Sequence, residues 1–156
     1  MSDLRQASDR HTIEPGMARE DIVGLFARRS AAWAARDAAA LAATHALNGV
    51  VVSPTGGVLE GRADIERVYR VWLSAFPDLV YKSEELIIDG NRVVEMAHLS
   101  GTHTGEFFGA APSGRRMGFA TAIVTTVENG EITHERRILD FTGVLVQVGV
   151  LKAKPV

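Results

Sequence analysis

The residues with the clearest chemical potential lie in one run near the C-terminal end, Glu131–Phe141, where Asp140 stands between two apolar residues. A carboxylate in apolar surroundings is costly to keep ionised, so it is usually paired, shifted in pKa or functional. As a general base, Asp140 could take a proton from a carbon flanked by carbonyl groups and return it to the new alkoxide. The alternatives are an ion pair with Arg136 or Arg137, or a cap on the segment that follows.

The alternation of side chains along a strand decides which charges can share a face with Asp140. If Asp140 faces a pocket, one set of residues shares its face and a second set faces away: His134, Arg136 and Ile138 in the first, Glu135, Arg137 and Leu139 in the second. Arg136 could then orient the carboxylate or polarise a ligand carbonyl. It could equally lie in solvent at the open end of the strand.

Two histidines are further candidates. His103 lies between Gly101 and Gly105, where small neighbours leave room for it to bond a ligand oxygen or to partner Asp140. It could instead tie the glycine-rich loop to the end of a strand. Strand phase places Glu95 on the face of His103. His45 follows a helix and could overhang a pocket mouth, or serve as a cap or surface residue.

Aromatic side chains could line a pocket for a flat polycyclic ligand, although most aromatic residues belong to a core. From the arguments given above for the carboxylate and the histidines, Asp140 and His103 are the candidate catalytic residues. The candidate substrate-binding residues are Arg136, Trp33, Trp72, Phe76, His45, Phe119 and Thr121.

Composition narrows the function classes. The chain has 156 residues, 46% of them hydrophobic and 23% charged, which indicates one soluble domain with its own core. The net charge of −2 and the absence of a basic stripe argue against nucleic-acid or anionic-membrane partners. There is no cysteine, and the five histidines are not spaced as metal ligands, so we expect no metal site. Phosphate-binding glycine motifs and a serine-nucleophile motif are also absent.

The N-terminal region, residues 1–17, is polar and lacks the apolar core of a signal peptide. We expect a mobile arm there and a cytoplasmic protein. Residues 18–151 are expected to form one domain, and residues 152–156 a tail.

Hydrophobic periodicity predicts three helices, at Ala18–Arg36, Ala38–Thr44 with Asp37 as its cap, and Gly61–Phe76. A short strand, Val50–Val52, lies among them and is followed by a turn at Ser53–Gly57. Four long strands follow: Leu79–Ile88, Arg92–Thr104, Arg115–Glu128 and Glu131–Phe141. Val144–Leu151 is a short apolar segment. Helices gathered before a run of antiparallel strands predict an α+β fold, with the helices packed in a curved sheet around a pocket.

Several motifs in order carry a family resemblance. Phe76–Leu79, Gly101–Gly109, Pro112–Arg115, and Asp140 followed by Gln147–Gly149 resemble the SnoaL-like polyketide cyclase family, of the NTF2-like superfamily, over roughly residues 18–149. The resemblance implies a cone-shaped fold and an intramolecular aldol condensation of an aromatic polyketide or polycyclic carbonyl compound, without metal or cofactor. It implies a pocket carboxylate, here Asp140, as general acid and base.

The same fold leaves two other functions open. One is cofactor-free hydroxylation of anthracycline-type rings, and the other is small-molecule binding without catalysis. An oligomer is also expected, because apolar residues such as Met96, Ala120, Ala122 and Val124 fall on the outer face of the sheet and need cover. The family resemblance implies a homodimer or homotetramer.

Overall fold

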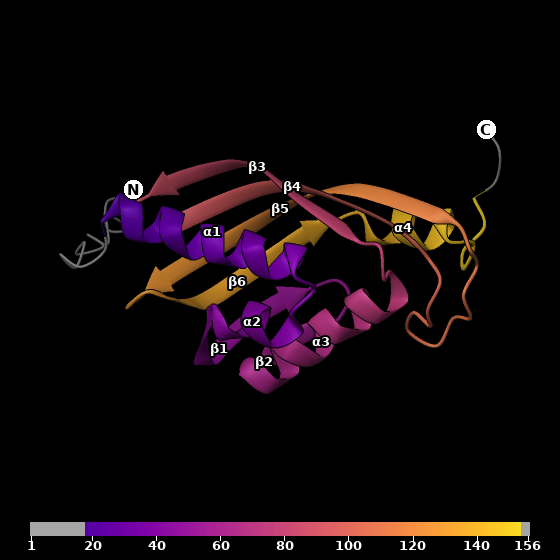
Figure 1. The fold of residues 1–156 in the computed structure, drawn as a ribbon, viewed down its shortest axis with the longest axis horizontal. Coiled ribbons are helices and arrows are strands. Elements are labelled where there is room, and N and C mark those ends of the chain that lie inside the picture. Colours follow the sequence, from indigo (N-terminus) through magenta and orange to yellow (C-terminus); the bar gives the residue numbers. More distant parts are fainter. Residues whose placement is uncertain (1–17, 154–156) are drawn as a thin grey trace, which may run out of the picture.

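The computed structural model describes residues 18–153, which form helices and a curved six-stranded sheet (Figure 1). In chain order the elements are α1 Arg19–Ala34, α2 Ala38–Ala43, β1 His45–Ser53, β2 Gly57–Glu60, α3 Arg62–Ala75, β3 Val80–Asp89, β4 Arg92–Thr102, β5 Arg116–Glu128, β6 Glu131–Leu139 and α4 Phe141–Gln147. The sheet order is β2-β1-β6-β5-β4-β3. Neighbours are antiparallel except β1 and β6, which are parallel.

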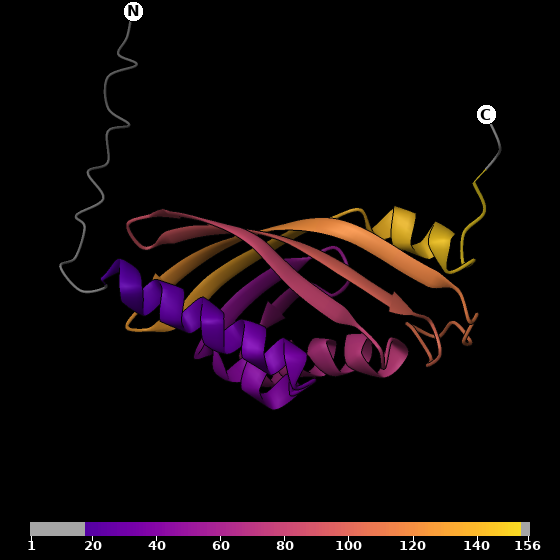
Figure 2. The same cartoon turned by 45° about the horizontal axis from the view of Figure 1, so that its top comes forward.

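Helices α1, α2 and α3 lie on one side of the curved sheet, and α4 lies at the end where β5 begins (Figure 2). This arrangement confirms the predicted α+β class. The predicted arm, residues 1–17, lies outside the described residues, as do residues 154–156 of the predicted tail. No helix between residues 18 and 153 is long and apolar enough to cross a membrane.

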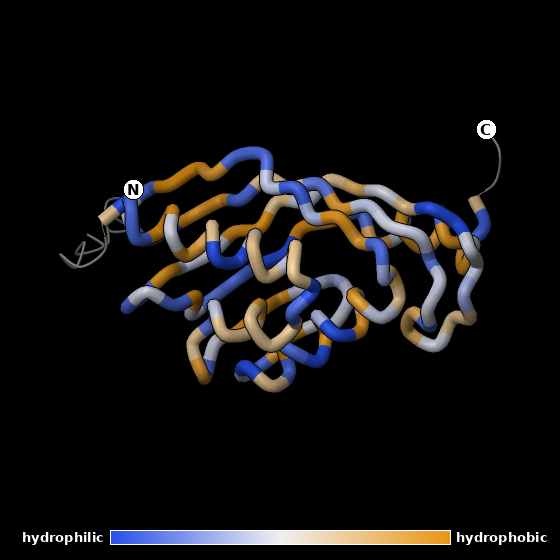
Figure 3. The backbone as a smooth tube through the Cα atoms, viewed as in Figure 1, coloured by the Kyte–Doolittle hydropathy of each residue, from blue (hydrophilic) through white to orange (hydrophobic). Residues whose placement is uncertain are grey.

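The long strands form where the sequence predicts them, because their side chains alternate between a covered and an open face. Hydrophobic and hydrophilic segments follow one another along these strands in Figure 3, and buried and more exposed positions alternate along β4 and β5. Asn129 and Gly130 both have positive φ, 51° and 77°, which a tight antiparallel hairpin requires. Asp37 caps α2 as expected, since its carboxylate accepts from the Ala40 N–H at 2.9 Å.

Three local predictions are wrong. The strand predicted at Val50–Val52 is the longer β1, and the turn beyond it leads directly into a missed strand, β2. The last long strand ends at Leu139 rather than Phe141. A fourth helix, α4, follows it, where only a short apolar segment was predicted. The cause is Asp140, whose side chain accepts from the Gly143 N–H at 2.8 Å and begins the helix.

The interior contains two apolar clusters with polar residues between them. On four elements an inward-facing polar residue falls between the two clusters: Arg29 on α1, Glu95 on β4, Thr125 on β5 and Glu135 on β6. One cluster, which includes Ile22, Phe26 and Val93, lies beneath the first half of α1. The larger cluster surrounds the aromatic residues of α1, α3 and the strands. We call Arg29, His45, Glu95, Thr125, Glu135 and Arg137 the polar layer; the first five are buried and Arg137 is half-buried.

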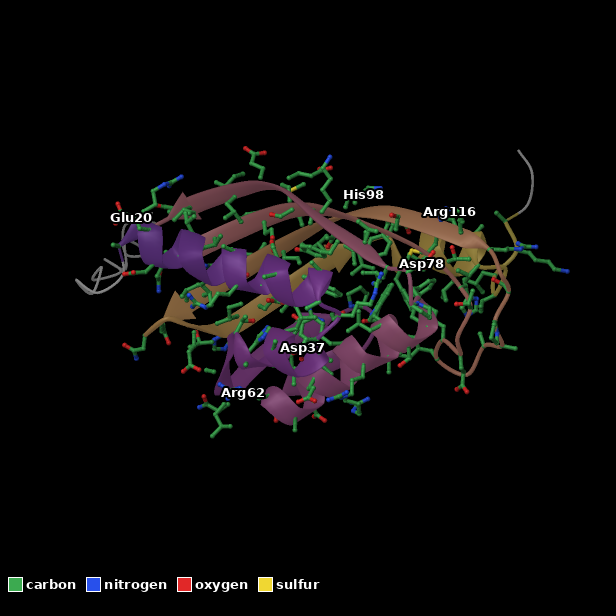
Figure 4. The ribbon with its side chains drawn as sticks, in the orientation of Figure 1. Glu20, Asp37, Arg62, Asp78, His98 and Arg116 are labelled. Carbon is green, nitrogen blue, oxygen red and sulfur yellow. The ribbon has the colours of Figure 1, made fainter. Side chains whose placement is uncertain are left out.

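Two polar contacts tie the helices to the sheet. Arg62, at the start of α3, donates to the His45 carbonyl at 2.7 Å and to Glu131 at 2.9 Å. Asp78, after α3, accepts from the N–H and the hydroxyl of Thr102, both at 2.7 Å. These two bonds lower the pKa of Asp78. Arg116 lies 4.0 Å from the same carboxylate, and Figure 4 shows Asp78 and Arg116 near each other at one end of the sheet. Both ends of α3 are thereby fixed against the strands.

Candidate functional site

A cavity opens on the concave face of the sheet, beneath α1 and α3. The empty space in this cavity and at its open mouth is about 420 Å³, open solvent included. Most of its lining is aromatic or aliphatic, with a few polar groups. The lining residues are Arg29, Trp33, Ser53, Thr55, Tyr69, Trp72, Tyr81, Leu99, Phe119, Thr121, Ile123, Arg137 and Leu139.

The aromatic walls are fixed by ring contacts. Trp33 stacks on Tyr81, with centroids 4.9 Å apart and planes at 3°, and meets Tyr69 edge-on at 5.3 Å. Trp72 lies 5.6 Å from Phe119 across the cavity lining. Because these rings come from α1, α3, β3 and β5, the packing of helices on the sheet sets the shape of the walls. Flat apolar walls of this kind suit a flat aromatic ligand.

The floor of the cavity is part of the polar layer, centred on Glu135. Arg29 donates to both oxygens of Glu135, at 2.6 and 3.2 Å, and Arg137 Nε donates to Oε1 at 2.6 Å. His45 Nε2 lies 3.2 Å from Oε2. Glu135 and Arg29 are buried, and the Arg137 guanidinium also lies over the ring of Tyr69, 4.6 Å from its centroid.

Burial and the neighbouring charges together determine the protonation states of Glu135 and His45. Burial would raise the pKa of Glu135, but the charges of Arg29 and Arg137 outweigh it and hold that pKa well below its usual value. Burial lowers the pKa of His45, and the opposing charge of Glu135 does not cancel the effect. His45 is therefore neutral near pH 7 and donates through Nε2–H to Glu135, which as a carboxylate can only accept.

Five side-chain atoms of lining residues are buried without a hydrogen-bond partner within residues 18–153: Arg29 Nε, Trp33 Nε1, Tyr69 Oη, Tyr81 Oη and Arg137 Nη2. Each can donate a hydrogen bond, and burying such a group unpaired costs stability. Apolar walls with several unpaired donors form a site for an aromatic molecule that carries oxygen acceptors.

The structure brings together four of the predicted substrate-binding residues. Trp33, Trp72, Phe119 and Thr121 line the cavity. The Thr121 hydroxyl is not free, because it donates to the Ile138 carbonyl at 2.9 Å. Phe76 is buried behind the lining, 5.7 Å from the Trp72 ring.

The remaining predicted residues lie outside the cavity. His45 does not overhang the mouth: it is fully buried below the floor. His103 is buried against Phe76, and its Nδ1 accepts from the Ser113 N–H at 3.2 Å and lies 2.9 Å from the Ser113 hydroxyl. Its position matches the loop-anchoring alternative. Arg136 is exposed and lines a second, more open hollow, which shares Ser53, Arg137 and Leu139 with the cavity.

Asp140 is exposed and caps α4, so its placement matches the capping alternative left open by the sequence. The face assignment made for a pocket-facing Asp140 is the reverse of what the structure has. Glu135, Arg137 and Leu139 face inward, whereas Arg136 and Ile138 face outward. Glu95 and His103 are both buried, although β4 ends at Thr102, before His103.

Sequence reasoning missed the polar floor. Arg29 lies on the apolar face of α1, at helical spacing from Phe26 and Trp33, and this arginine among apolar residues was the available signal. Tyr69 and Tyr81 had no distinguishing motif, and Glu135 with Arg137 was assigned to the wrong face. No group of three or more His, Asp or Glu residues within the described chain is arranged to hold a metal ion.

A comparison with known protein families gives a match. Residues 25–148 match a family model described as SnoaL-like polyketide cyclase. No curated protein matches the chain.

Three solved structures share the fold at 24% sequence identity. AclR, a putative hydroxylase from Streptomyces galilaeus, has a TM-score of 0.76 and covers 88% of this chain and 87% of its own. A putative SnoaL-like polyketide cyclase from Jannaschia sp. CCS1 has a TM-score of 0.76, with coverages of 94% and 99%. IdmH, a putative polyketide cyclase from Streptomyces antibioticus, has a TM-score of 0.69, with coverages of 81% and 97%. These likenesses confirm the predicted cone-shaped fold.

Proposed function

The chain belongs to the SnoaL-like polyketide cyclase family, and from this premise we propose that it is a cofactor-independent tailoring enzyme. Its substrate is an aromatic polyketide or a similar polycyclic carbonyl compound, which binds in the cavity beneath α1 and α3. The reaction is an intramolecular aldol condensation driven by general acid and base catalysis.

The observation that carries this proposal is the set of unpaired donors within aromatic walls. Trp33, Tyr69, Tyr81 and Arg137 each offer a buried N–H or O–H without a partner in the described chain. A polyketide presents carbonyl and hydroxyl oxygens around a flat carbon skeleton, which matches both features. Donors aimed at a carbonyl oxygen also stabilise the enolate that forms when the adjacent carbon loses a proton.

The buried cations favour the same step. Arg29 and Arg137 remain charged, because Glu135 is among the groups that raise their pKa against the effect of burial. Their positive potential at the floor of a poorly solvated cavity supports negative charge on a bound substrate. Positioning the two reacting carbons within one rigid cavity supplies a further part of the rate.

The acid and base roles predicted for Asp140 and His103 remain hypotheses. Both side chains lie away from the cavity lining. We therefore use Asp140→Asn as a matched variant: Asn also caps helices, so the fold is kept while the carboxylate is removed. Full turnover by Asp140→Asn would place the base elsewhere.

The test combines binding with turnover. The chain has only two tryptophans, Trp33 and Trp72, and both line the cavity, so intrinsic fluorescence reports directly on occupancy. We expect polycyclic carbonyl compounds to quench this fluorescence, and Tyr69→Phe or Tyr81→Phe to weaken binding by about 3- to 10-fold, the loss of one hydrogen bond. Failure of a panel of such compounds to quench the fluorescence or to be cyclised would reject the proposal. Binding without turnover would instead favour the non-catalytic alternative.

A second candidate function, cofactor-free hydroxylation, is favoured by the likeness to the putative hydroxylase AclR. Oxygen separates the two reactions, because an aldol condensation needs none. We expect equal turnover in air and under strict anaerobic conditions. Turnover that stops without oxygen would favour the hydroxylase.

The homodimer or homotetramer expected from the sequence stays a prediction. Met96, Ala122 and Val124 on the outer face of the sheet are partly exposed in the single chain, and a second copy would cover them. Light scattering of the purified protein decides the point.

A further inference from the structure

Glu95, on β4, is a buried carboxylate with an unusual environment. Its exposed fraction is 0%, and neither oxygen has a hydrogen-bond partner of standard geometry within residues 18–153. Glu135 is equally deep in the polar layer but has Arg29, Arg137 and His45 as partners. A buried carboxylate without partners is costly for the folded state, so Glu95 is not explained by stability.

Glu95 lies directly beside the cavity. In the sheet register Ile123 stands between Glu95 on one neighbouring strand and Arg137 on the other. Ile123 and Arg137 line the cavity, and Glu95 lies one strand beyond them on the same inward face. Glu95 is thus behind the cavity wall, without access to a bound molecule.

Tyr81 connects the two positions. It lines the cavity, its ring is held by stacking on Trp33, and its hydroxyl has no partner of standard hydrogen-bond geometry. Burial raises the pKa of Tyr81, and the nearby carboxylate of Glu95 raises it further, through its charge and a loose hydrogen bond. Tyr81 is therefore a protonated phenol with the cavity on one side and a carboxylate acceptor on the other.

We propose that the Glu95 carboxylate takes up and later returns the proton of the acid–base cycle. It does so through Tyr81, whose hydroxyl contacts the substrate. This inference rests on the proposed function and names the acid–base pair of that same cavity. Tyr81, which lines the cavity, is the catalytic residue in this scheme, and Glu95 acts on the substrate only through Tyr81.

The proton balance closes over one turnover. The substrate C–H proton moves to Tyr81 Oη while the phenol proton of Tyr81 moves to the Glu95 carboxylate, and the C–H electron pair becomes an enolate. The enolate carbon bonds to the carbonyl carbon, whose oxygen becomes an alkoxide. That alkoxide takes a proton from Tyr81, which recovers one from Glu95. The product is an isomer of the substrate, and both side chains return to their starting states.

The charged and titratable groups near Glu95 and Tyr81 come from several elements. They are Arg29 on α1, Tyr69 on α3, and Glu135 and Arg137 on β6, with His45 beyond Glu135. The two arginines keep their charge, the tyrosine stays neutral and Glu135 stays ionised around neutral pH, since the pKa of each is shifted away from that range. His45 is the exception, because its pKa is lowered from the usual 6.5.

The experiment compares Glu95→Gln, Tyr81→Phe and the double variant with wild type, using fluorescence quenching for binding and product formation for turnover. We expect kcat to fall about 100-fold or more in each single variant, while Glu95→Gln binds the same compound within about twofold. The double variant should be no slower than either single one, because the two residues act as a unit.

Several results would overturn the inference. They are turnover by Glu95→Gln or Tyr81→Phe at more than half the wild-type rate, or multiplied losses in the double variant. Thermal unfolding checks that Glu95→Gln folds. If Glu95→Gln does not fold, the turnover of Tyr81→Phe tests the inference instead. A wild-type protein that neither binds nor converts any compound overturns the proposed function as well, whereas an active Glu95→Gln overturns this inference alone.

Discussion

Glu135→Gln removes the anion from the centre of the polar layer, and we expect it to be the most destabilising single change of a charged residue in this chain. The carboxylate accepts three bonds from Arg29 and Arg137 and one from His45. Its side chain is 0% exposed, and those of the two arginines are 1% and 10% exposed. The substitution leaves two buried guanidinium groups without a counter-charge.

The expected loss follows from the burial of these groups. Removing one partner of a buried ion pair costs about 3–5 kcal/mol, because the remaining charge stays away from water. The glutamine oxygen can still accept one bond, which places the expected loss at the lower end, about 3 kcal/mol. For a chain of this length each kcal/mol lowers Tm by about 2–4 °C, so Tm should fall by about 6–12 °C.

The assay is urea unfolding at pH 7, followed by circular dichroism, with Glu131→Gln as the matched control. Glu131 lies on the same strand and pairs with Arg62 at 2.9 Å, but those side chains are 45% and 33% exposed. An exposed ion pair is worth at most about 1 kcal/mol. The two variants change the same chemical group and differ in burial.

The reasoning fails if Glu135→Gln loses less than about 1 kcal/mol, or no more than Glu131→Gln does. The buried pair would then contribute no more than a surface pair, and the polar layer would not depend on its central charge. An increase in the urea dependence of the unfolding free energy would instead indicate a change in the unfolded state.

Three further predictions concern pH, the helix cap and the loop at Gly105. The pKa of His45 is depressed in the folded protein from its usual 6.5, so below about pH 6.5 the unfolded chain binds the extra proton first. The unfolding free energy of the wild type should therefore fall as pH falls through this range. In urea titrations at several pH values, the unfolding free energy of His45→Gln should depend less steeply on pH. Asp140→Ala should cost about 1 kcal/mol of unfolding free energy through loss of the cap, while Asp140→Asn costs less, and neither should change ligand quenching of the tryptophans. Gly105→Ala should cost about 1–3 kcal/mol of unfolding free energy, because a Cβ there would overlap the Ser74 carbonyl. In the control Gly109→Ala the new Cβ meets no neighbouring atom, and only the positive φ of that residue disfavours the substitution. Thermal unfolding compares the two variants.

The fold was largely predictable because its signals are local. The alternation along β4 and β5 and the turn at Asn129–Gly130 each depend on a few neighbouring residues. The parallel pairing of β1 with β6 was not predictable in this way. It joins segments far apart in the chain, and the short apolar run at Val50–Val52 contains no sign of its partner.

The site was less predictable, because the interpretation of a single residue, Asp140, determined which side chains of β6 were expected to face inward. Asp140 attracted attention as an acid among apolar residues, and treating it as strand carried the face assignment back along β6. In the structure the strand ends at Leu139, and Asp140 begins a helix. A cap and a buried acid look alike in sequence, since both place an aspartate before apolar residues. Once the strand is ended there, Glu135 and Arg137 become the inward pair.

The two inward-facing carboxylates, Glu135 and Glu95, differ in whether their contacts stabilise the fold. Glu135 is held by three basic side chains, and its charge balances Arg29 and Arg137. Glu95 sits at the same depth, yet no side chain forms a standard hydrogen bond with it within the described residues. An apolar residue at position 95 would remove that cost and would join the apolar residues on either side of it on β4, Val93 and Ala97. Stability therefore accounts for Glu135 but not for Glu95, and the cavity-lining hydroxyl of Tyr81 is a group influenced by Glu95 that can exchange a proton with it.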